Sequence, residues 1–141
     1  MDRVLAARNE HVVVVCATSG DTGGAAVEAF RGSKRVQAVV LFPNGRISDV
    51  QRRMITTAAE SNVHAVAIQG TFDDCQAMVK RAFADPDLKH IPLSSANSIN
   101  IGRLLPQSVY YFYAASRVAL AGEPIVFSVP SGNFGDMMGA V

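Results

Sequence analysis

Continuously apolar segments that alternate with helix-period segments constrain the fold of this chain more than any other feature. Residues 12–16 read Val-Val-Val-Val-Cys, so neither side of the pleat would carry a polar side chain. This pattern is typical of a strand in a sheet that is covered on both faces. Further strands are predicted at residues 36–42, 63–68, 92–94 and 125–129. Because a helix between successive strands makes those strands parallel, the sequence predicts a parallel sheet with helices on both faces.

Local helix signals lie between the predicted strands. Ser48, followed by Gln51, and Thr71, followed by two aspartates, are typical N-caps. Residues 20–24 are predicted to form a turn. Pro106 falls in the first turns of the last long helix, where proline is tolerated. The predicted helices span residues 1–8, 25–31, 48–60, 71–84 and 101–120.

The composition limits the classes of function that the chain can have. Its 141 residues carry a formal net charge of +1, which fits one soluble domain without a basic surface for nucleic acid. The apolar run at residues 12–17 is too short to span a membrane and lacks the charged leader of a signal peptide. Cys16, Cys75 and the three histidines lie in no metal-binding pattern and are predicted to be structural. We therefore expect a cytoplasmic protein without a metal, membrane or nucleic-acid partner.

The first of three polar loops covers residues 17–24, between a predicted strand and a predicted helix. Free backbone N–H groups at a helix N-terminus, with the hydroxyls of Thr18, Ser19 and Thr22, can bind an anion. The same residue types also cap helices, so Thr18, Ser19 and Asp21 have a purely structural interpretation as well. The loop lacks the GxxxxGK[ST] pattern, which argues against a nucleotide-binding P-loop.

The second polar loop covers residues 94–103 and again lies between a strand and a helix. Arg103 can form two parallel hydrogen bonds to a phosphate, while Asn97 and Ser98 donate from the loop. The structural alternative is a capped helix with a solvated arginine. Because a cation near a helix N-terminus opposes the helix dipole, the position of Arg103 favours a functional role.

The third polar loop covers residues 130–136. Gly132 and Gly135 allow the backbone to approach a ligand closely, and the loop amides can surround an oxyanion; the alternative is a tight turn. All three loops follow strands, and ligands of open parallel sheets bind beyond the carboxyl ends of strands. The sequence therefore predicts a cleft for one or two anionic small molecules.

These loops and the segments between them resemble the threonine synthase family. The similar segments are ATSGDTG at 17–23, LFPNGRIS at 41–48, GTFDDCQ at 70–76, NSINIGRLLPQ at 97–107, YYF at 110–112 and VPSGNFGD at 129–136. They cover nearly the whole chain in the family's order. The resemblance implies a pyridoxal-phosphate lyase of fold type II, in which two similar domains enclose the cofactor. It also implies conversion of O-phospho-L-homoserine and water to L-threonine and phosphate.

The resemblance also implies roles for individual loop residues. The residues similar to the loop that holds the substrate's carboxylate are Thr18, Ser19, Asp21 and Thr22. The residues similar to the site for the substrate's phosphate are Asn97, Ser98 and Arg103. The residues similar to the loop that binds the cofactor's phosphate are Gly132, Asn133, Phe134 and Gly135.

One part of the family's catalytic machinery has no counterpart in this sequence. The family's Schiff-base lysine lies upstream of the ATSGDTG loop, whereas Lys34, Lys80 and Lys89 lie in unlike contexts. No residue of this chain is therefore expected to be catalytic. Because the lysine tethers the cofactor, the chain alone is expected to be inactive and not to hold pyridoxal phosphate.

We accordingly expect a fragment of a larger enzyme. Residues 1–122 would form its smaller domain, and residues 123–141 the first strand and phosphate loop of a truncated second domain. The expected fold is a three-layer α/β/α arrangement whose four parallel strands have the order 3-2-1-4, counting from residues 12–16. The predicted strand at 125–129 would be a fifth, belonging to the incomplete domain. Its unpaired edge would favour self-association through the cut face.

Two alternatives to threonine synthase remain open at the level of sequence. Another fold type II lyase, such as threonine dehydratase, is possible, but its substrate carries no phosphate for residues 97–103 to bind. A non-catalytic, flavodoxin-like module that binds a small anion is the other alternative, because a chain without the lysine would behave in that way.

Overall fold

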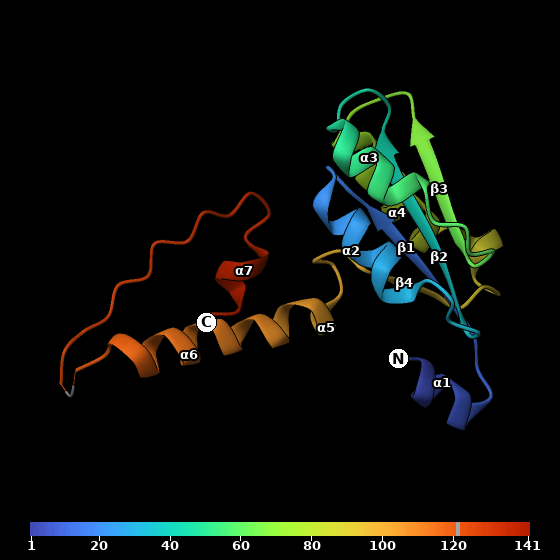
Figure 1. Cartoon of the computed structure of the whole chain (residues 1–141). Helices are drawn as coiled ribbons and strands as arrows, with labels where there is room; N and C mark the ends of the chain where they lie inside the picture. Colours follow the sequence, from blue (N-terminus) through green and yellow to red (C-terminus); the bar gives the residue numbers. More distant parts are fainter. Residues whose placement is uncertain (121) are drawn as a thin grey trace. The chain divides into compact units, whose positions relative to one another are not determined.

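The computed structural model describes residues 1–120 and 122–141, which form two compact units, Met1–Asn97 and Ser98–Val141 (Figure 1). The first unit contains the sheet, and the second contains short helices and an irregular segment. The domains expected at 1–122 and 123–141 describe how the chain would divide within a larger enzyme. The two compact units do not test that division, which stays a prediction. No helix in these described ranges is both long and apolar enough to cross a membrane.

The sheet of the first unit contains four parallel strands in the order β3-β2-β1-β4, which confirms the expected order (Figure 1). The strands are β1 (Val12–Ala17), β2 (Val36–Pro43), β3 (Val63–Ile68) and β4 (Leu93–Ser95). Val13 of β1 pairs with Gln37 on one side and with Leu93 on the other. The direction in which successive strands are added reverses between β1 and β4, so the carboxyl ends of these two strands form the expected switch point.

Strand β1 is buried on both faces, as its uninterrupted apolar sequence predicts. Cys16 packs into one core together with α2 (Asp21–Phe30) and α3 (Asp49–Thr56). Val15 and Ala17 pack into a second core together with Cys75 and Val79 of α4 (Phe72–Ala84). The unit is therefore a three-layer α/β/α structure. Burial in the second core raises the pKa of the Cys75 thiol, and so keeps it neutral.

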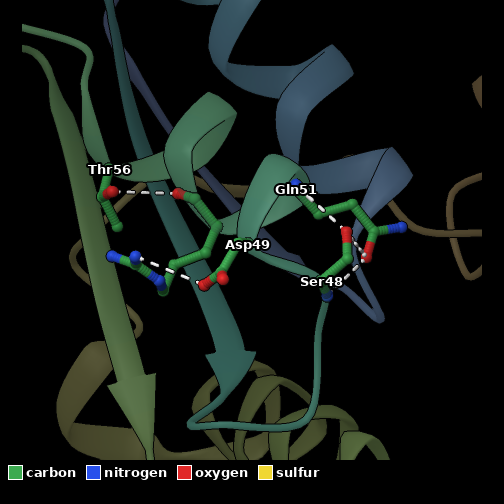
Figure 2. Close-up of polar contacts among 5 residues, drawn as sticks. Ser48, Asp49, Gln51 and Thr56 are labelled. Atoms are coloured by element: carbon green, nitrogen blue, oxygen red, sulfur yellow. Dashed lines mark hydrogen bonds and ion pairs between the residues drawn. The ribbon is translucent and has the colours of Figure 1, made fainter.

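The two predicted helix caps of the first unit are present. The Oγ of Ser48 accepts from the N–H of Gln51 at 3.3 Å, and the Oε1 of Gln51 accepts from the N–H of Ser48 at 3.0 Å (Figure 2). Thr71 and Asp74 form the same reciprocal box at the start of α4. The N–H and hydroxyl of Thr71 stabilise the ionised carboxyl group and thereby lower the pKa of Asp74.

Several predicted boundaries in the first unit differ from the structure, most of them by one residue. Helix α2 begins at Asp21 instead of residue 25, so the turn predicted over residues 20–24 is wrong beyond Gly20. The reason is packing: a Cβ on Gly23 would lie 2.5 Å from Cγ2 of Thr18, so this glycine permits a close approach rather than a turn. Helix α3 ends at Thr56 instead of residue 60, and the hydroxyls of Thr56 and Thr57 bond to helix carbonyls there. Strand β4 begins one residue later than predicted.

The other helical segments of the first unit are α1 (Asp2–Arg8), which confirms the predicted first helix, and η1 (Pro86–Leu88). In the second unit, the helix predicted over residues 101–120 is divided into three segments. These are α5 (Ile101–Leu104), the 3-10 turn η2 (Leu105–Gln107) and α6 (Ser108–Val118). The division occurs at Pro106, which has no N–H group to continue the α-helical ladder.

The strand predicted at residues 125–129 is absent from the part of the chain that the structure describes. These residues form an irregular segment that packs against α6, with the rings of Phe127 and Tyr111 edge to face at 5.2 Å. Strand geometry requires a partner backbone for its N–H and C=O groups. No described strand of this unit offers one, and the segment ends at a short helix, α7 (Gly135–Met138).

Asn62 holds together three backbone segments of the first unit. It is buried, and its Nδ2 donates to the carbonyl oxygens of Phe30 at 2.8 Å and Val36 at 2.9 Å. Its Oδ1 accepts from the N–H of Gly32 at 3.0 Å. These bonds join the end of α2, the following turn and the start of β2, so Asn62 fixes how the first crossover enters the sheet.

Replacing Asn62 by alanine would remove the side-chain partner of the Val36 carbonyl and of the Gly32 N–H, and would leave the Phe30 carbonyl with the N–H of Ser33 alone. We expect Asn62→Ala to lower the free energy of unfolding by about 3 kcal/mol, the upper range for unsatisfied buried groups. Urea unfolding followed by circular dichroism measures the change. Gln37→Ala is the control: the Gln37 carboxamide is exposed and, among the described residues, bonds only to His64, so a change below about 0.5 kcal/mol is expected. Equal effects of the two substitutions would contradict this assignment.

Candidate functional site

The loop that follows β1 is shaped by the buried side chain of Thr18. The Oγ1 of Thr18 accepts from the N–H groups of Gly20 at 2.9 Å and Gly23 at 2.8 Å. The residue is 1% exposed, so the hydroxyl faces the backbone rather than solvent. The structural interpretation of Thr18 is therefore supported. A direct contact between Thr18 and a ligand stays a prediction.

The same loop presents free hydrogen-bond donors. Ser19 and Asp21 are exposed and Thr22 is half-buried. Their three backbone N–H groups have no hydrogen-bond partner among the residues that the structure describes. They lie at the N-terminus of the ten-residue helix α2, where unpaired N–H groups and the helix dipole favour an anion. The arrangement can bind a carboxylate.

Asn97 connects the end of β4 to the end of β1. Its Oδ1 accepts from the N–H of Ala17 at 2.8 Å, and its Nδ2 donates to the carbonyl oxygen of Ala17 at 2.7 Å. The N–H of Asn97 in turn donates to Oγ of Ser95 at 3.0 Å. Sequence reasoning singled out Asn97 as a phosphate donor but missed this clamp, which no local pattern signals. The two hydrogen bonds of the clamp hold Ala17, where the first polar loop begins, beside Asn97 of the second polar loop.

Ser98 and Arg103 belong to the second unit. Arg103 is exposed, and its guanidinium makes no ion pair with any described residue. The backbone carbonyl of Arg103 accepts from Nε2 of Gln107 at 2.6 Å, which steadies the first turns of this helical segment. Whether Ser98 and Arg103 meet the loop after β1 stays a prediction. An exposed, unpaired guanidinium is suited to a phosphate group.

The third polar loop contains a backbone shape that collects N–H groups. Phe134 has a left-handed conformation with a φ of 56°, which residues other than glycine seldom adopt. The next residue, Gly135, is helical. The N–H groups of residues 132–135 have no hydrogen-bond partner in the described ranges. A Cβ added to Gly132 would meet nothing within 4 Å, so this side of the loop is open. Alternating left- and right-handed residues of this kind form concavities that bind anions.

Two of the predicted phosphate-binding regions lie next to each other within the second unit. A Cβ built on Gly135 would lie 3.3 Å from Cβ of Ser98 and 3.5 Å from Cδ2 of Leu104. Ser98, predicted for the substrate's phosphate, is therefore in contact with the loop predicted for the cofactor's phosphate. Their proximity fits two anionic groups bound side by side.

Tyr111 holds the third loop against α6. Its phenol donates to the backbone carbonyl of Asp136 at 2.9 Å. Burial of the phenol, together with the nearby Asp136 carboxylate, raises the pKa of Tyr111, so the hydroxyl stays a donor. The Oδ1 atom of Asp136 is buried without a hydrogen-bond partner among the described residues, which marks a place for a donor from elsewhere. No local sequence pattern signals the bond from Tyr111, which joins residues 25 apart.

Comparison with known proteins identifies close relatives of the whole chain, although no family model matches it. The threonine synthase of Pseudomonas aeruginosa is 50% identical over 138 residues, which cover 97% of this chain and 29% of that protein. The threonine synthase of Escherichia coli is 49% identical over 133 residues, which cover 93% of this chain and 31% of that protein.

Solved structures of threonine synthases are also similar to this chain. The crystal structure of threonine synthase from Escherichia coli matches 98% of this chain with a TM-score of 0.87 and 46% identity. The crystal structure of PLP-bound threonine synthase from Brucella melitensis matches 99% with a TM-score of 0.80 and 51% identity. The matches cover 33% and 30% of those chains. The chain thus spans about three tenths of the length of these relatives.

Removing the Thr18 hydroxyl would release the loop that follows β1. We expect Thr18→Val, which keeps the volume, to lower the free energy of unfolding by about 2–4 kcal/mol, because the N–H groups of Gly20 and Gly23 lose their acceptor. Thr18→Ser keeps the acceptor and should cost about 1 kcal/mol for the lost methyl group. Chemical denaturation of the three proteins checks the difference. If valine were no worse than serine, the hydroxyl would not hold the loop.

Proposed function

We propose that this chain, which is homologous to threonine synthases over nearly its entire length, forms the substrate-binding part of such an enzyme. The protein that contains it would convert O-phospho-L-homoserine and water to L-threonine and phosphate. The observation that carries the proposal is the set of free backbone donors at the carboxyl edge of the sheet, beside the point where β1 and β4 meet.

The substrate has two anionic groups, and the chain offers donors that suit each of them. The free N–H groups of Ser19, Asp21 and Thr22 would bind the carboxylate, with the hydroxyls of Ser19 and Thr22 beside them. Ser98 and the guanidinium of Arg103, which makes no ion pair within the described ranges, would bind the phosphate. Asn97 would act mainly by holding the end of β4 against Ala17.

Residues 132–135 fit the phosphate of pyridoxal phosphate. Four successive N–H groups without partners among the described residues, and the open side of Gly132, leave room for an oxyanion. Gly132, Asn133, Phe134 and Gly135 would hold that phosphate, and Tyr111 would keep the loop against α6. When bound, the cofactor supplies the electron sink for the reaction. The residues of this chain would orient the phosphates and the carboxylate.

The lysine that tethers the cofactor would come from a segment outside these 141 residues. Lys34 lies in the turn before β2, at the opposite edge of the sheet from the loops, and Lys89 lies before β4 at that same opposite edge. Lys80 is exposed on α4. None of these positions suits a group that must reach the carboxyl edge.

Substitution of Arg103 tests which phosphate this residue binds. In the complete protein that contains this chain, we expect Arg103→Ala to lower kcat/KM for O-phospho-L-homoserine about 30-fold, or about 2 kcal/mol, mainly through KM. Cofactor content, measured by absorbance, should hardly change. Arg117→Ala is the matched control, because Arg117 stacks on Tyr113 in the last turn of α6 and should leave KM unchanged. Loss of cofactor with unchanged substrate affinity would mean that the two phosphate sites are exchanged.

The same assay separates the two enzyme alternatives. A threonine synthase releases phosphate from O-phospho-L-homoserine, whereas a threonine dehydratase would consume L-threonine without a phosphorylated substrate. If the complete protein consumed only L-threonine, and Arg103→Ala had no effect, the proposal would be wrong.

The 141-residue chain by itself is expected to release no phosphate from O-phospho-L-homoserine. Incubation with pyridoxal phosphate, reduction with borohydride and peptide mapping by mass spectrometry should find only partial labelling, spread over Lys34, Lys80 and Lys89. The complete protein is the positive control. Full labelling of a single lysine of the chain, together with phosphate release, would show that the chain carries its own tether.

A further inference from the structure

The side chain of Gln51 connects the cap of α3 to the loop that follows β1. Its Oε1 accepts from the N–H of Ser48 at 3.0 Å and from Oγ of Ser48 at 3.1 Å, so the side chain folds back over the start of the helix (Figure 2). Its Nε2 donates to Oδ1 of Asp21 at 2.8 Å. The oxygen of the carboxamide therefore bonds to the cap of α3, and its nitrogen bonds to the first residue of α2.

Gln51 also covers the turn at Gly20. This glycine has a φ of 142°, which residues with a side chain rarely adopt. A Cβ built on it would overlap the carboxamide of Gln51. Glycine is therefore required at position 20 both for its conformation and for the space that Gln51 fills. The contact places the Gln51 side chain directly against the first turn of the candidate carboxylate site.

The bond to Asp21 has an electrostatic consequence for that site. Asp21 is the first residue of α2, and a free carboxylate in the first turn is attracted to the unpaired N–H groups of its own helix. It would then compete with any incoming carboxylate. Because Nε2 of Gln51 holds Oδ1 of Asp21, the Asp21 carboxylate is restrained, and the N–H groups of Ser19, Asp21 and Thr22 stay without partners among the described residues.

We propose that Gln51 is a positioning residue, which holds Asp21 and the Gly20 turn so that the loop can receive the substrate's carboxylate. The proposal rests on the proposed function for the identity of that ligand. Gln51 touches no substrate in this account and acts through Asp21 and Gly20.

Gln51→Glu separates the two tasks of the side chain. Glutamate at this position still accepts from the N–H of Ser48, so the capping box is kept. Its second oxygen replaces the Nε2 donor and faces the Asp21 carboxylate, so an attraction becomes a repulsion. Ser48→Ala is the reciprocal control, because it removes the serine hydroxyl of the box but leaves Nε2 of Gln51 free to hold Asp21.

The kinetic experiment uses the complete protein that contains this chain. For Gln51→Glu, KM for O-phospho-L-homoserine should rise roughly tenfold, as expected when a charge-assisted hydrogen bond becomes a like-charge contact, while kcat changes less than about threefold. For Ser48→Ala, KM should stay within about twofold of the wild-type value. A KM for Gln51→Glu that equals the wild-type KM would overturn the proposal.

Hydrogen exchange of the peptide covering residues 17–24, measured by mass spectrometry on the same proteins, reports the loop directly. Exchange should be faster in Gln51→Glu than in the wild type and unchanged in Ser48→Ala. Combining Asp21→Asn with Gln51→Glu restores a donor and an acceptor with reversed direction, so slow exchange should return. Unchanged exchange in Gln51→Glu, or no recovery in the double variant, would contradict the positioning role.

The two arms separate failure of this inference from failure of the proposed function. If the wild-type protein released no phosphate from O-phospho-L-homoserine, the proposed function would fail, whereas the exchange data would still decide whether Gln51 holds the loop. If the wild type were active and Gln51→Glu matched it in both arms, only the role of Gln51 would fail.

Discussion

Burial of β1 on both faces is the constraint on which the first unit depends. Cys16 contributes to the core under α2 and α3, and Val15 and Ala17 contribute to the core under α4. A fully buried valine side chain contributes about 1.5–3 kcal/mol relative to an exposed one, and a smaller side chain such as that of Ala17 contributes less. A strand with these properties needs helices on both sides and parallel neighbours, and parallel neighbours place their following loops at one edge. The position of the candidate site follows from this packing.

Polar side chains at that edge bind mainly to the backbone of the protein itself. Thr18 takes the N–H groups of Gly20 and Gly23, and Asn97 takes both backbone groups of Ala17. Asn62 performs a similar task at the opposite end of β2. Groups that are fixed in this way cost little to organise when a ligand arrives. Preorganisation by buried polar residues leaves the exposed N–H groups of residues 19, 21 and 22 for a ligand.

The candidate anion site of the second unit is formed in a different way. The unit has no sheet among its described residues. Tyr111 holds the third loop by a phenol–carbonyl bond to Asp136, and its ring contacts Phe127 in the segment before that loop. The left-handed Phe134 lies in a run of N–H groups, residues 132–135, that have no partner among the described residues. Apolar side chains of this unit, including Val126 at 91% exposure, remain uncovered. Such surface is typical of a segment that packs against another part of a protein.

The sequence by itself determined the features that depend on neighbours within a few residues or on the apolar pattern. These are the four strands, the covered sheet, the capping boxes at Ser48 and Thr71, and the three small polar loops. A capping box joins residues three apart, so its partners are visible in the sequence. The segments shared with threonine synthases also pointed to the family before any geometry was known.

Only the tertiary structure decided the features that depend on distant partners. The glycines at 23 and 24 predict a turn from local preference, but close packing on Thr18 and Met54 makes them helical. The long-range partners of Asn62, Asn97 and Gln51 lie 26 to 80 residues away and follow no local rule. Residues 125–129 have strand-like sequence, yet a strand forms only when a second backbone pairs with it. Local preference proposes an element, and long-range contacts decide whether it forms and what its side chains hold.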